Sequence, residues 1–136
     1  MHGNRDFLIG DKFCKDVGAK LLKDPFIFNL NGKKIMLMHG DSLCTDDKDY
    51  QEFRNLVRNK DWQKDFLSKD LKERKEVAKS LREISSLENK TKDEAIMDVN
   101  QDEVLRIIEN HSLDVLIHGH TPVSYTHLTL PTIYSE

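Results

Sequence analysis

The chain has 136 residues, of which 38% are hydrophobic and 33% are charged, and its formal net charge is −3. This length suits one domain with a single core, and the hydrophobic fraction excludes an intrinsically disordered chain. The small negative charge excludes a general electrostatic attraction to nucleic acid. The two cysteines are far apart and form no disulfide framework, so a reducing cytosol is expected. With neither a long apolar run nor a signal peptide, any membrane contact is expected to be peripheral.

The charge is uneven along the chain. Residues 58–82 hold nine Lys and Arg against five Asp and Glu, so this segment is cationic while the remainder is acidic. Such a segment could lie on an anionic lipid surface. The alternative, which the charge pattern alone favours, is a set of solvated helices with ion pairs between residues four apart.

The N-terminal third reads as a loop, a short helix and a β-hairpin. We expect a short helix over 7–18 and strands over 20–22, 26–30 and 33–38. Asn31-Gly32 is a strong signal for a two-residue hairpin turn between the last two strands. The returning strand ends at His39-Gly40-Asp41.

The rest of the chain is helical until one last strand. Apolar residues recur at helical spacing from residue 46 to 87, and residues 85–92 are expected to loop back. Asn100 can cap a helix that ends near His111, with four apolar residues inward: Val104, Leu105, Ile107 and Ile108. The strand 114–117 follows, which gives an α/β order with polar residues at the carboxyl ends of strands.

Histidines follow two of these strands. His118-Gly119-His120 comes directly after Val115-Leu116-Ile117, and the glycine between the two histidines is expected to let the backbone bend. Neutral imidazole is a common ligand of divalent metals, so the pair indicates a metal site at the mouth of the sheet. Read alone, these two histidines are more often strand-end polar residues than ligands.

Three short blocks together carry a family resemblance. In order they are Gly3-Asn4-Arg5-Asp6, His39-Gly40-Asp41 and His118-Gly119-His120. They resemble three of the five signature blocks of the calcineurin-like metallophosphoesterases. The resemblance implies two divalent metal ions held by Asp, His and Asn, which generate a hydroxide nucleophile and bind the phosphoryl oxygens.

The residues around these blocks narrow the resemblance. Arg5 stands where most of the superfamily has His, and the segments 38–47 and 95–100 are equally distinctive. They resemble the UDP-2,3-diacylglucosamine diphosphatase family of the lipid A pathway. The resemblance implies an α/β fold, a partial metallophosphoesterase-type β-sandwich flanked by helices over 1–121. A helical lid insertion over the acyl chains would span 48–94.

The resemblance also implies roles for individual residues. Asn4, His39, His118 and His120 match metal ligands, with manganese the typical ion. Arg5 matches a residue placed against the substrate, where a bidentate guanidinium suits phosphate. Arg5 and His118 are the catalytic candidates, with His118 considered for proton transfer. The substrate-contacting positions are Asn4, Arg5, Asp47, Ser85, Asn89, Lys92 and His118, with helix capping as the alternative role of Asp47.

Two departures qualify these expectations. The family's Asp-x-His block and the upstream Gly-Asp block that bridges both metals are absent, and 122–136 differs from the family. We therefore expect a fragment truncated at both ends, inactive in isolation, with a non-native tail that packs poorly. Two residues near the site have other expected roles: Asp41 orients His39 or its loop, and Cys44 packs.

Three functional interpretations remain open from the sequence. The first is hydrolysis of UDP-2,3-diacylglucosamine to UMP and 2,3-diacylglucosamine 1-phosphate at the cytoplasmic side of a Gram-negative inner membrane, by a peripheral protein. The second is a general metallophosphoesterase acting on nucleotides or phosphoproteins, against which Arg5 and the cationic lid argue. The third is a non-catalytic chain with a partial metal site. A monomer and no nucleic-acid partner are expected.

Overall fold

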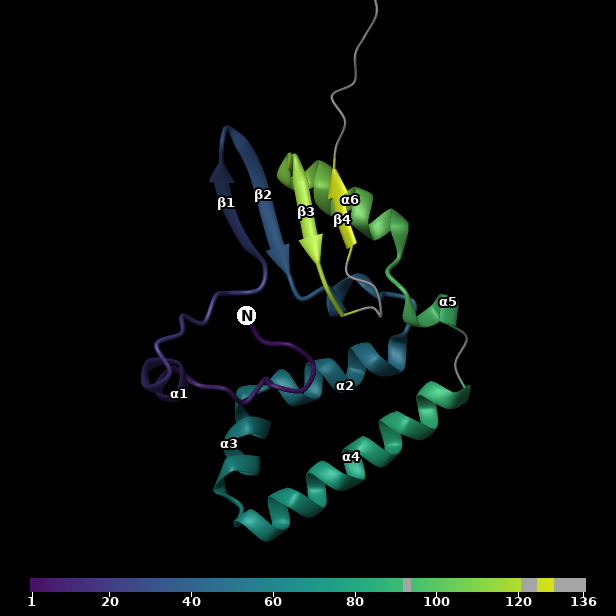
Figure 1. Cartoon of the computed structure of the whole chain (residues 1–136). Helices are drawn as coiled ribbons and strands as arrows, with labels where there is room; N and C mark the ends of the chain where they lie inside the picture. Colours follow the sequence, from purple (N-terminus) through teal and green to yellow (C-terminus); the bar gives the residue numbers. More distant parts are fainter. Residues whose placement is uncertain (92–93, 121–124, 129–136) are drawn as a thin grey trace, which may run out of the picture. The chain divides into compact units, whose positions relative to one another are not determined.

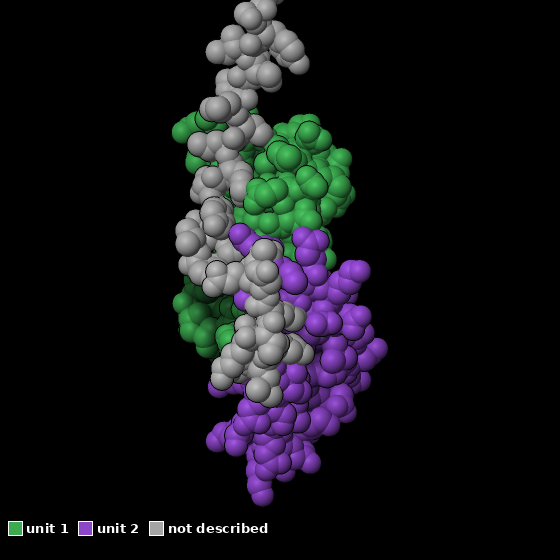
Figure 2. All heavy atoms as spheres, turned by 90° about the vertical axis from the view of Figure 1, so that its right-hand side faces the viewer, with its two compact units in different colours: residues 1–45, 99–136 green, residues 46–98 purple. Residues whose placement is uncertain are grey.

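The chain divides into two compact units in a computed structural model. The structure describes residues 1–91, 94–120 and 125–128; for 86–91, 94–95 and 125–128 it describes the backbone alone. One unit, the α/β unit, comprises Met1–Thr45 and Val99–Glu136, and the other, the helical unit, comprises Asp46–Asp98 (Figure 2).

A four-stranded mixed sheet forms the centre of the α/β unit (Figure 1). Its order along the sheet is β1 (Phe26–Leu30), β2 (Lys33–Met38), β3 (Val115–His118) and β4 (Tyr125–Leu128). The outer two pairs are antiparallel, while β2 and β3 run parallel. The predicted turn is confirmed: Asn31 and Gly32 both take positive φ, as a tight hairpin requires.

The core of this unit lies between the sheet and helix α6 (Gln101–His111). Alternate residues of β2 and β3 point to one face, where Met36 and Leu116 meet Val104 and Ile108 of α6. Leu116 is fully buried. Burying each of these side chains contributes about 2 kcal/mol, so this layer fixes the two parallel strands relative to each other.

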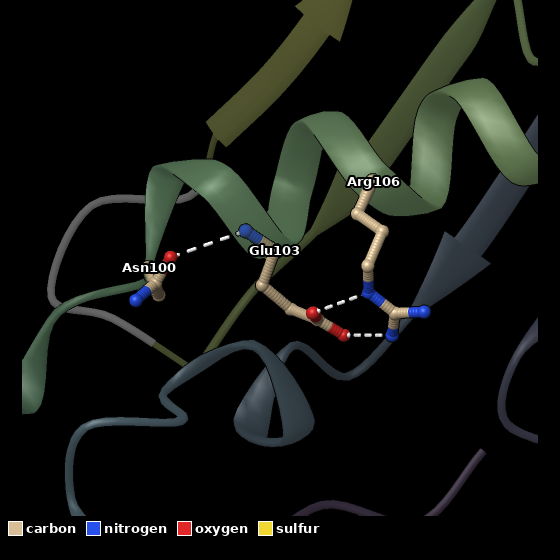
Figure 3. Close-up of polar contacts among 3 residues, drawn as sticks. All are labelled: Asn100, Glu103 and Arg106. Atoms are coloured by element: carbon tan, nitrogen blue, oxygen red, sulfur yellow. Dashed lines mark hydrogen bonds and ion pairs between the residues drawn. The ribbon is translucent and has the colours of Figure 1, made fainter.

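Helix α6 begins where the sequence predicts, at the Asn100 cap. The Asn100 side chain accepts a hydrogen bond from the Glu103 N–H at 3.1 Å (Figure 3). Glu103 in turn forms two hydrogen bonds with the Arg106 guanidinium, at 2.7 and 2.6 Å. The hydrogen bond from Arg106 lowers the pKa of the Glu103 carboxyl. Helix α6 is thus stabilised by side-chain contacts in its first two turns.

The helical unit consists of α2 (Lys48–Arg58), α3 (Lys60–Ser68), α4 (Leu71–Thr91) and α5 (Glu94–Met97). Asp47 caps α2 by accepting from the Tyr50 N–H, and Asn59 caps α3 by accepting from two backbone N–H groups. Trp62 and Phe66 stack on each other along α3, and Phe66 is buried. Among the helices the structure describes, none is long and apolar enough to cross a membrane.

The remaining elements are short. Helix α1 (Asp11–Asp16) follows the N-terminal loop, and the 3₁₀ turn η1 (Asp41–Leu43) follows β2. Leu43, the last residue of η1, and Cys44, which follows it, both belong to the hydrophobic core cluster. This agrees with the packing role expected for Cys44. The backbone N–H of Asn100 donates to the Leu43 carbonyl at 2.9 Å and ties η1 to the start of α6.

The α/β class is confirmed, as are the strands predicted at 26–30 and 33–38. Three local predictions are wrong. Residues 20–22 form no strand because no neighbouring strand pairs with them, and the helix predicted over 7–18 covers only 11–16 because Gly10 is extended. Residues 85–91 do not loop back but continue α4, since neither Gly nor Pro interrupts them.

Two further predictions concern side chains and the end of the chain. Leu105, predicted to face the core, is 56% exposed because α6 turns only one face to the sheet. Tyr125–Leu128 of the tail pair with β3 as strand β4, and the poor packing expected for the tail stays a prediction. Residues 122–124 and 129–136 lie outside the described part of the chain. The non-native origin expected for the tail stays a prediction.

Candidate metal centre

Two histidine-bearing loops leave the sheet at the same edge. Strands β2 and β3 are parallel neighbours, and Met38 is paired with His118 at their carboxyl ends. His39 continues β2 and Gly119-His120 continues β3, so both loops start side by side. The carboxyl edge of parallel strands is the usual place for a binding site in an α/β fold.

The rings of His39 and His120 meet edge to face. Their centroids are 5.0 Å apart and their planes are inclined by 76°. His120 adopts a left-handed backbone conformation with φ of 75°. A non-glycine residue in this region stores strain, and such strain is characteristic of functional sites. The structure therefore brings together two of the four predicted ligands.

His39 offers a nitrogen atom for a ligand. Its Nε2 atom is buried and makes no hydrogen bond within the described part of the chain. Its backbone is held at both ends, since its N–H donates to Asp24 Oδ1 at 3.2 Å and its carbonyl accepts from the Gly119 N–H at 3.0 Å. A buried polar nitrogen without a partner is costly unless a bound group satisfies it.

Gly40 lets the two loops approach closely. Its φ is +103°, and a Cβ atom there would come 2.6 Å from the Gly119 carbonyl oxygen and 3.0 Å from His118 Nδ1. The sequence assigned the bend to Gly119, but the left-handed residues are Gly40 and His120. Gly119 instead contributes its N–H to the His39 carbonyl. The prediction of a bend at Gly119 was thus wrong, because the residue types of a loop do not determine its φ angles.

His118 lies at the buried end of β3. It is 2% exposed, and its Nδ1 lies 3.0 Å from the Gly119 carbonyl oxygen. A carbonyl can only accept, so a hydrogen bond at this contact requires a proton on Nδ1. A backbone carbonyl partner of this kind commonly fixes the tautomer of a metal-binding histidine.

The N-terminal loop passes against His39 through Gly3. A Cβ atom on Gly3 would lie 3.4 Å from His39 Cε1 and 3.2 Å from the Asp6 carboxylate, which accepts the Gly3 N–H. His2 Nε2 and the Ile9 carbonyl oxygen are 2.6 Å apart and close the loop. Asn4 and Arg5, the next two residues, are exposed.

The donor set fits part of a divalent-metal site. His39, His118 and His120 supply imidazole nitrogens, and Asn4 lies one residue from the Gly3 contact with His39. Imidazole is a typical ligand of zinc, copper, iron and nickel, and carbonyl oxygen is a typical ligand of manganese and magnesium, so this donor set combines both kinds. Among the side chains that the structure describes, no three of His, Cys, Asp or Glu form a complete metal-binding group.

The predicted substrate residues of the helical unit have separate positions. Asp47 is buried and caps α2, so its capping role is confirmed and its substrate role stays a prediction. Ser85 is half-buried on α4, and Asn89 lies on the same helix with its side chain outside the description. Lys92 lies outside the described residues.

Comparison with known proteins decides the family. The family model of the calcineurin-like phosphoesterases matches residues 1–124. The chain belongs to the calcineurin-like phosphoesterase family. Asn4, His39 and His120 therefore lie in loops of a phosphoesterase fold, and His118 ends strand β3.

Curated relatives of this phosphoesterase share one name, UDP-2,3-diacylglucosamine hydrolase. The protein of Marinobacter nauticus is 53% identical over 121 residues, which is 89% of this chain and 50% of the relative. That of Chromohalobacter salexigens is 50% identical over 89% of this chain and 49% of the relative. The protein of Haemophilus influenzae strain Rd is 47% identical over 88% of this chain and 51% of the relative. The chain spans about half the length of the curated relatives it matches.

Sequence reasoning missed the residues that hold the histidines in place. No role for Asp24 or His2 was predicted, and Gly40 was named only within the His39-Gly40-Asp41 block. His2 closes the N-terminal loop. The hairpin register was the available signal for Asp24, because extending it by two residues places Asp24 opposite His39.

Proposed function

We propose that this phosphoesterase hydrolyses the diphosphate bond of UDP-2,3-diacylglucosamine, releasing UMP and 2,3-diacylglucosamine 1-phosphate. The observation that carries the proposal is the meeting of His39 and His120 at the carboxyl ends of parallel strands, with the Arg5 loop against His39. The names of the relatives give the substrate.

The proposed ligands are Asn4, His39, His118 and His120, and the proposed cofactor is two divalent ions, Mn²⁺ by preference. When bound, such ions supply an activated water and neutralise charge on the phosphoryl oxygens. His39 contributes a buried Nε2 that no described group satisfies. For His118, the contact of Nδ1 with a carbonyl supports ligation through Nε2, and a ligating nitrogen cannot also accept a proton. The geometry therefore favours His118 as a ligand over a proton carrier.

Arg5 is the proposed contact to the diphosphate. Its guanidinium is exposed on a loop that Gly3 fixes against His39, so it can reach a phosphate beside the ligands. A guanidinium forms two parallel hydrogen bonds with a phosphoryl group and stays charged at every physiological pH. Arg5 would thus orient the diphosphate and stabilise charge that develops on it.

The helical unit is proposed to bind the lipid part of the substrate. We assign polar contacts with the diacylglucosamine to Asp47, Ser85, Asn89 and Lys92, and a lid function to residues 48–94. The excess of Lys and Arg over residues 58–82 supports peripheral attachment to an anionic membrane, on the cytoplasmic face of a Gram-negative inner membrane. A monomer without nucleic-acid partners is the proposed state.

A chimaera tests the proposed reaction. The 121 aligned residues of the Marinobacter nauticus relative are replaced by the matching residues of this chain, and UMP release is followed with Mn²⁺. We expect release of UMP, and a loss of about 100-fold when Arg5→Ala removes the phosphate contact. Arg5→Lys should recover only part of that loss. A folded chimaera that cleaves bis-p-nitrophenyl phosphate but not the UDP-lipid would indicate a general phosphoesterase and overturn the proposal.

For the chain by itself we propose a partial metal site without catalysis. The supporting observation is that no group of three acidic, His or Cys side chains gathers within the described residues. Calorimetric titration with Mn²⁺ is expected to give no more than one weakly bound ion per chain. Tight binding of two ions, or UMP release by the chain alone, would contradict this.

A further inference from the structure

The end of the β1–β2 hairpin places one carboxylate beside a proposed metal ligand. The antiparallel register pairs Phe26 with Leu37, and two residues further along this register Asp24 stands opposite His39. Pro25 follows Asp24 and has no N–H, so regular pairing of the two backbones cannot continue there. The backbone hydrogen bonds between the two strands end there, and the Asp24 side chain accepts a hydrogen bond from His39 instead.

The contact itself is between a side chain and a backbone group. The His39 N–H donates to Asp24 Oδ1 at 3.2 Å in a half-buried position. From the other side, the Gly119 N–H donates to the His39 carbonyl at 3.0 Å. Both peptide groups of His39 are therefore bonded, one to the segment before β1 and one to the loop after β3. Two such bonds on opposite sides leave the residue little rotational freedom.

This backbone arrangement determines where the imidazole points. The His39 ring lies 5.0 Å from the His120 ring, and its buried Nε2 has no hydrogen-bond partner within the described residues. Because Nε2 makes no hydrogen bond to hold the ring, the backbone and the packing of His39 contribute to its position. Gly3, whose Cβ position would lie 3.4 Å from His39 Cε1, supplies packing on one side.

We propose that Asp24 is a positioning residue for the metal centre: its carboxylate holds the His39 backbone so that Nε2 faces the ion. This inference rests on the proposed function, since it assumes that His39 binds a metal. Asp24 contacts neither substrate nor metal in this account. Removing such a supporting contact commonly weakens metal binding by about tenfold or more.

The test is Mn²⁺ affinity of the full chain, measured by calorimetry, for matched variants. Asp24→Ala removes the acceptor and should weaken binding about tenfold. Asp24→Asn keeps a carbonyl acceptor at the same place and should stay within about twofold of the unchanged chain. Asp16→Ala is the control, because Asp16 pairs with Lys12 on the exposed surface of α1 and should leave affinity unchanged.

A second measurement needs no variant and separates positioning from general stability. Hydrogen exchange of the metal-free chain should show a protected His39 amide, because its N–H is bonded to Asp24. A His39 amide that exchanges as fast as an unprotected loop amide overturns the proposal, even if Asp24→Ala does not fold. Urea unfolding of each variant without metal shows whether affinity falls beyond any loss of fold.

The outcomes distinguish this inference from the proposed function. If the unchanged chain and Asp24→Ala bind Mn²⁺ with equal affinity, the positioning role of Asp24 is contradicted and the proposed metal centre is not. If Asp24→Asn loses as much affinity as Asp24→Ala, the charge matters and the backbone contact does not, which also overturns the role. If the unchanged chain binds no Mn²⁺ at all, the proposed metal centre falls and this inference falls with it.

Discussion

The α/β unit and the helical unit maintain their structures by different means. In the α/β unit, Leu43, Val104 and Leu116 are at most 1% exposed and belong to one continuous hydrophobic cluster. In the helical unit, Val57 and Phe66 are the buried hydrophobic residues among the described side chains, while capping residues and surface ion pairs mark its helix ends and faces. The first unit depends on burial and the second more on local helix formation.

This difference bears on what each unit can do. A metal centre needs ligands fixed to within a fraction of an ångström, which rigid strand ends supply. His39 and His118 continue or end strands whose other residues form the core. Exposed apolar side chains occur in both units, since Leu56, Leu67, Leu71 and Ile84 of the helical unit and Phe13, Val17, Leu30 and Leu105 of the α/β unit are each at least half exposed. Apolar exposure therefore does not distinguish the units, and the proposed lipid contact of the helical unit depends on its excess of Lys and Arg.

The largest expected effect tests the close packing of the strand ends. Gly40→Ala places a methyl group 2.6 Å from the Gly119 carbonyl oxygen at a φ of +103°, so we expect a loss of about 3 kcal/mol in the free energy of unfolding. Gly18→Ala is the matched control, because φ is +68° there but nothing lies within 4 Å of the new methyl. Its backbone cost alone is about 1 kcal/mol. If Gly40→Ala and Gly18→Ala lower the free energy of unfolding in urea equally, the loops after β2 and β3 are not tightly packed.

The same substitution in both units compares their cores directly. Val104 and Val57 are 1% and 2% exposed, one in each unit. Val104→Ala should lower the free energy of unfolding of the α/β unit by about 2 kcal/mol, because the cavity lies in a continuous cluster. Val57→Ala should reduce amide protection in α2 and α3 and leave that of β2 and β3 unchanged. Loss of protection in both units from either variant would contradict the comparison.

Two histidine substitutions, His39→Ala and His111→Ala, test whether the strand ends bind metal. His39→Ala should weaken Mn²⁺ binding at least tenfold, about 1.4 kcal/mol, because it removes a buried nitrogen without a partner. His111→Ala is the control, since His111 ends α6 and is exposed. Calorimetric titration measures both. The account fails at this point if both variants bind Mn²⁺ as the unchanged chain does.

The smallest expected effect is a pH dependence at the start of α6. Because the hydrogen bond from Arg106 lowers the pKa of Glu103 below its ordinary 4.5, the folded state binds the Glu103 proton less readily than the unfolded state. The stabilisation is therefore present above pH 4.5 and is lost as the pH falls through the lowered pKa. Glu103→Gln should be less stable than the unchanged chain at pH 7, and the difference in the free energy of unfolding should shrink as the pH falls below 4.5, by urea unfolding. A difference that does not shrink on acidification would exclude the ion pair as its source.

Much of this architecture was predictable because local signals agreed with the tertiary structure. The Asn31-Gly32 turn, the strand over 33–38 and the Asn100 cap each depend on nearby residues, and each is found as predicted. The predicted strand at 20–22 and the inward Leu105 failed because each depends on a partner that the local sequence does not reveal. The continuation of α4 beyond residue 85 shows that polar composition alone does not end a helix.

The residue types of the candidate site were predictable, but the backbone conformations and contacts that hold them in place were not. The spacing of His118 and His120 and the strand before His39 indicated a shared edge, which the parallel pairing of β2 and β3 provides. The left-handed conformation of His120 arises where two loops far apart in the sequence meet, so no local pattern contains it. The contact from Asp24 to His39 was signalled only by the register of the hairpin, extended by two residues.

The most direct test of the metal centre is titration of the full chain with Mn²⁺ while the histidine ring signals are followed by NMR. The account predicts that substoichiometric Mn²⁺ broadens the ring signals of His39, His118 and His120 first, because the ion binds between the two strand-end loops. The ring of His111, at the end of α6, should remain sharp at the same concentration. Equal broadening of all histidines, or none in His39 and His120, would contradict the account.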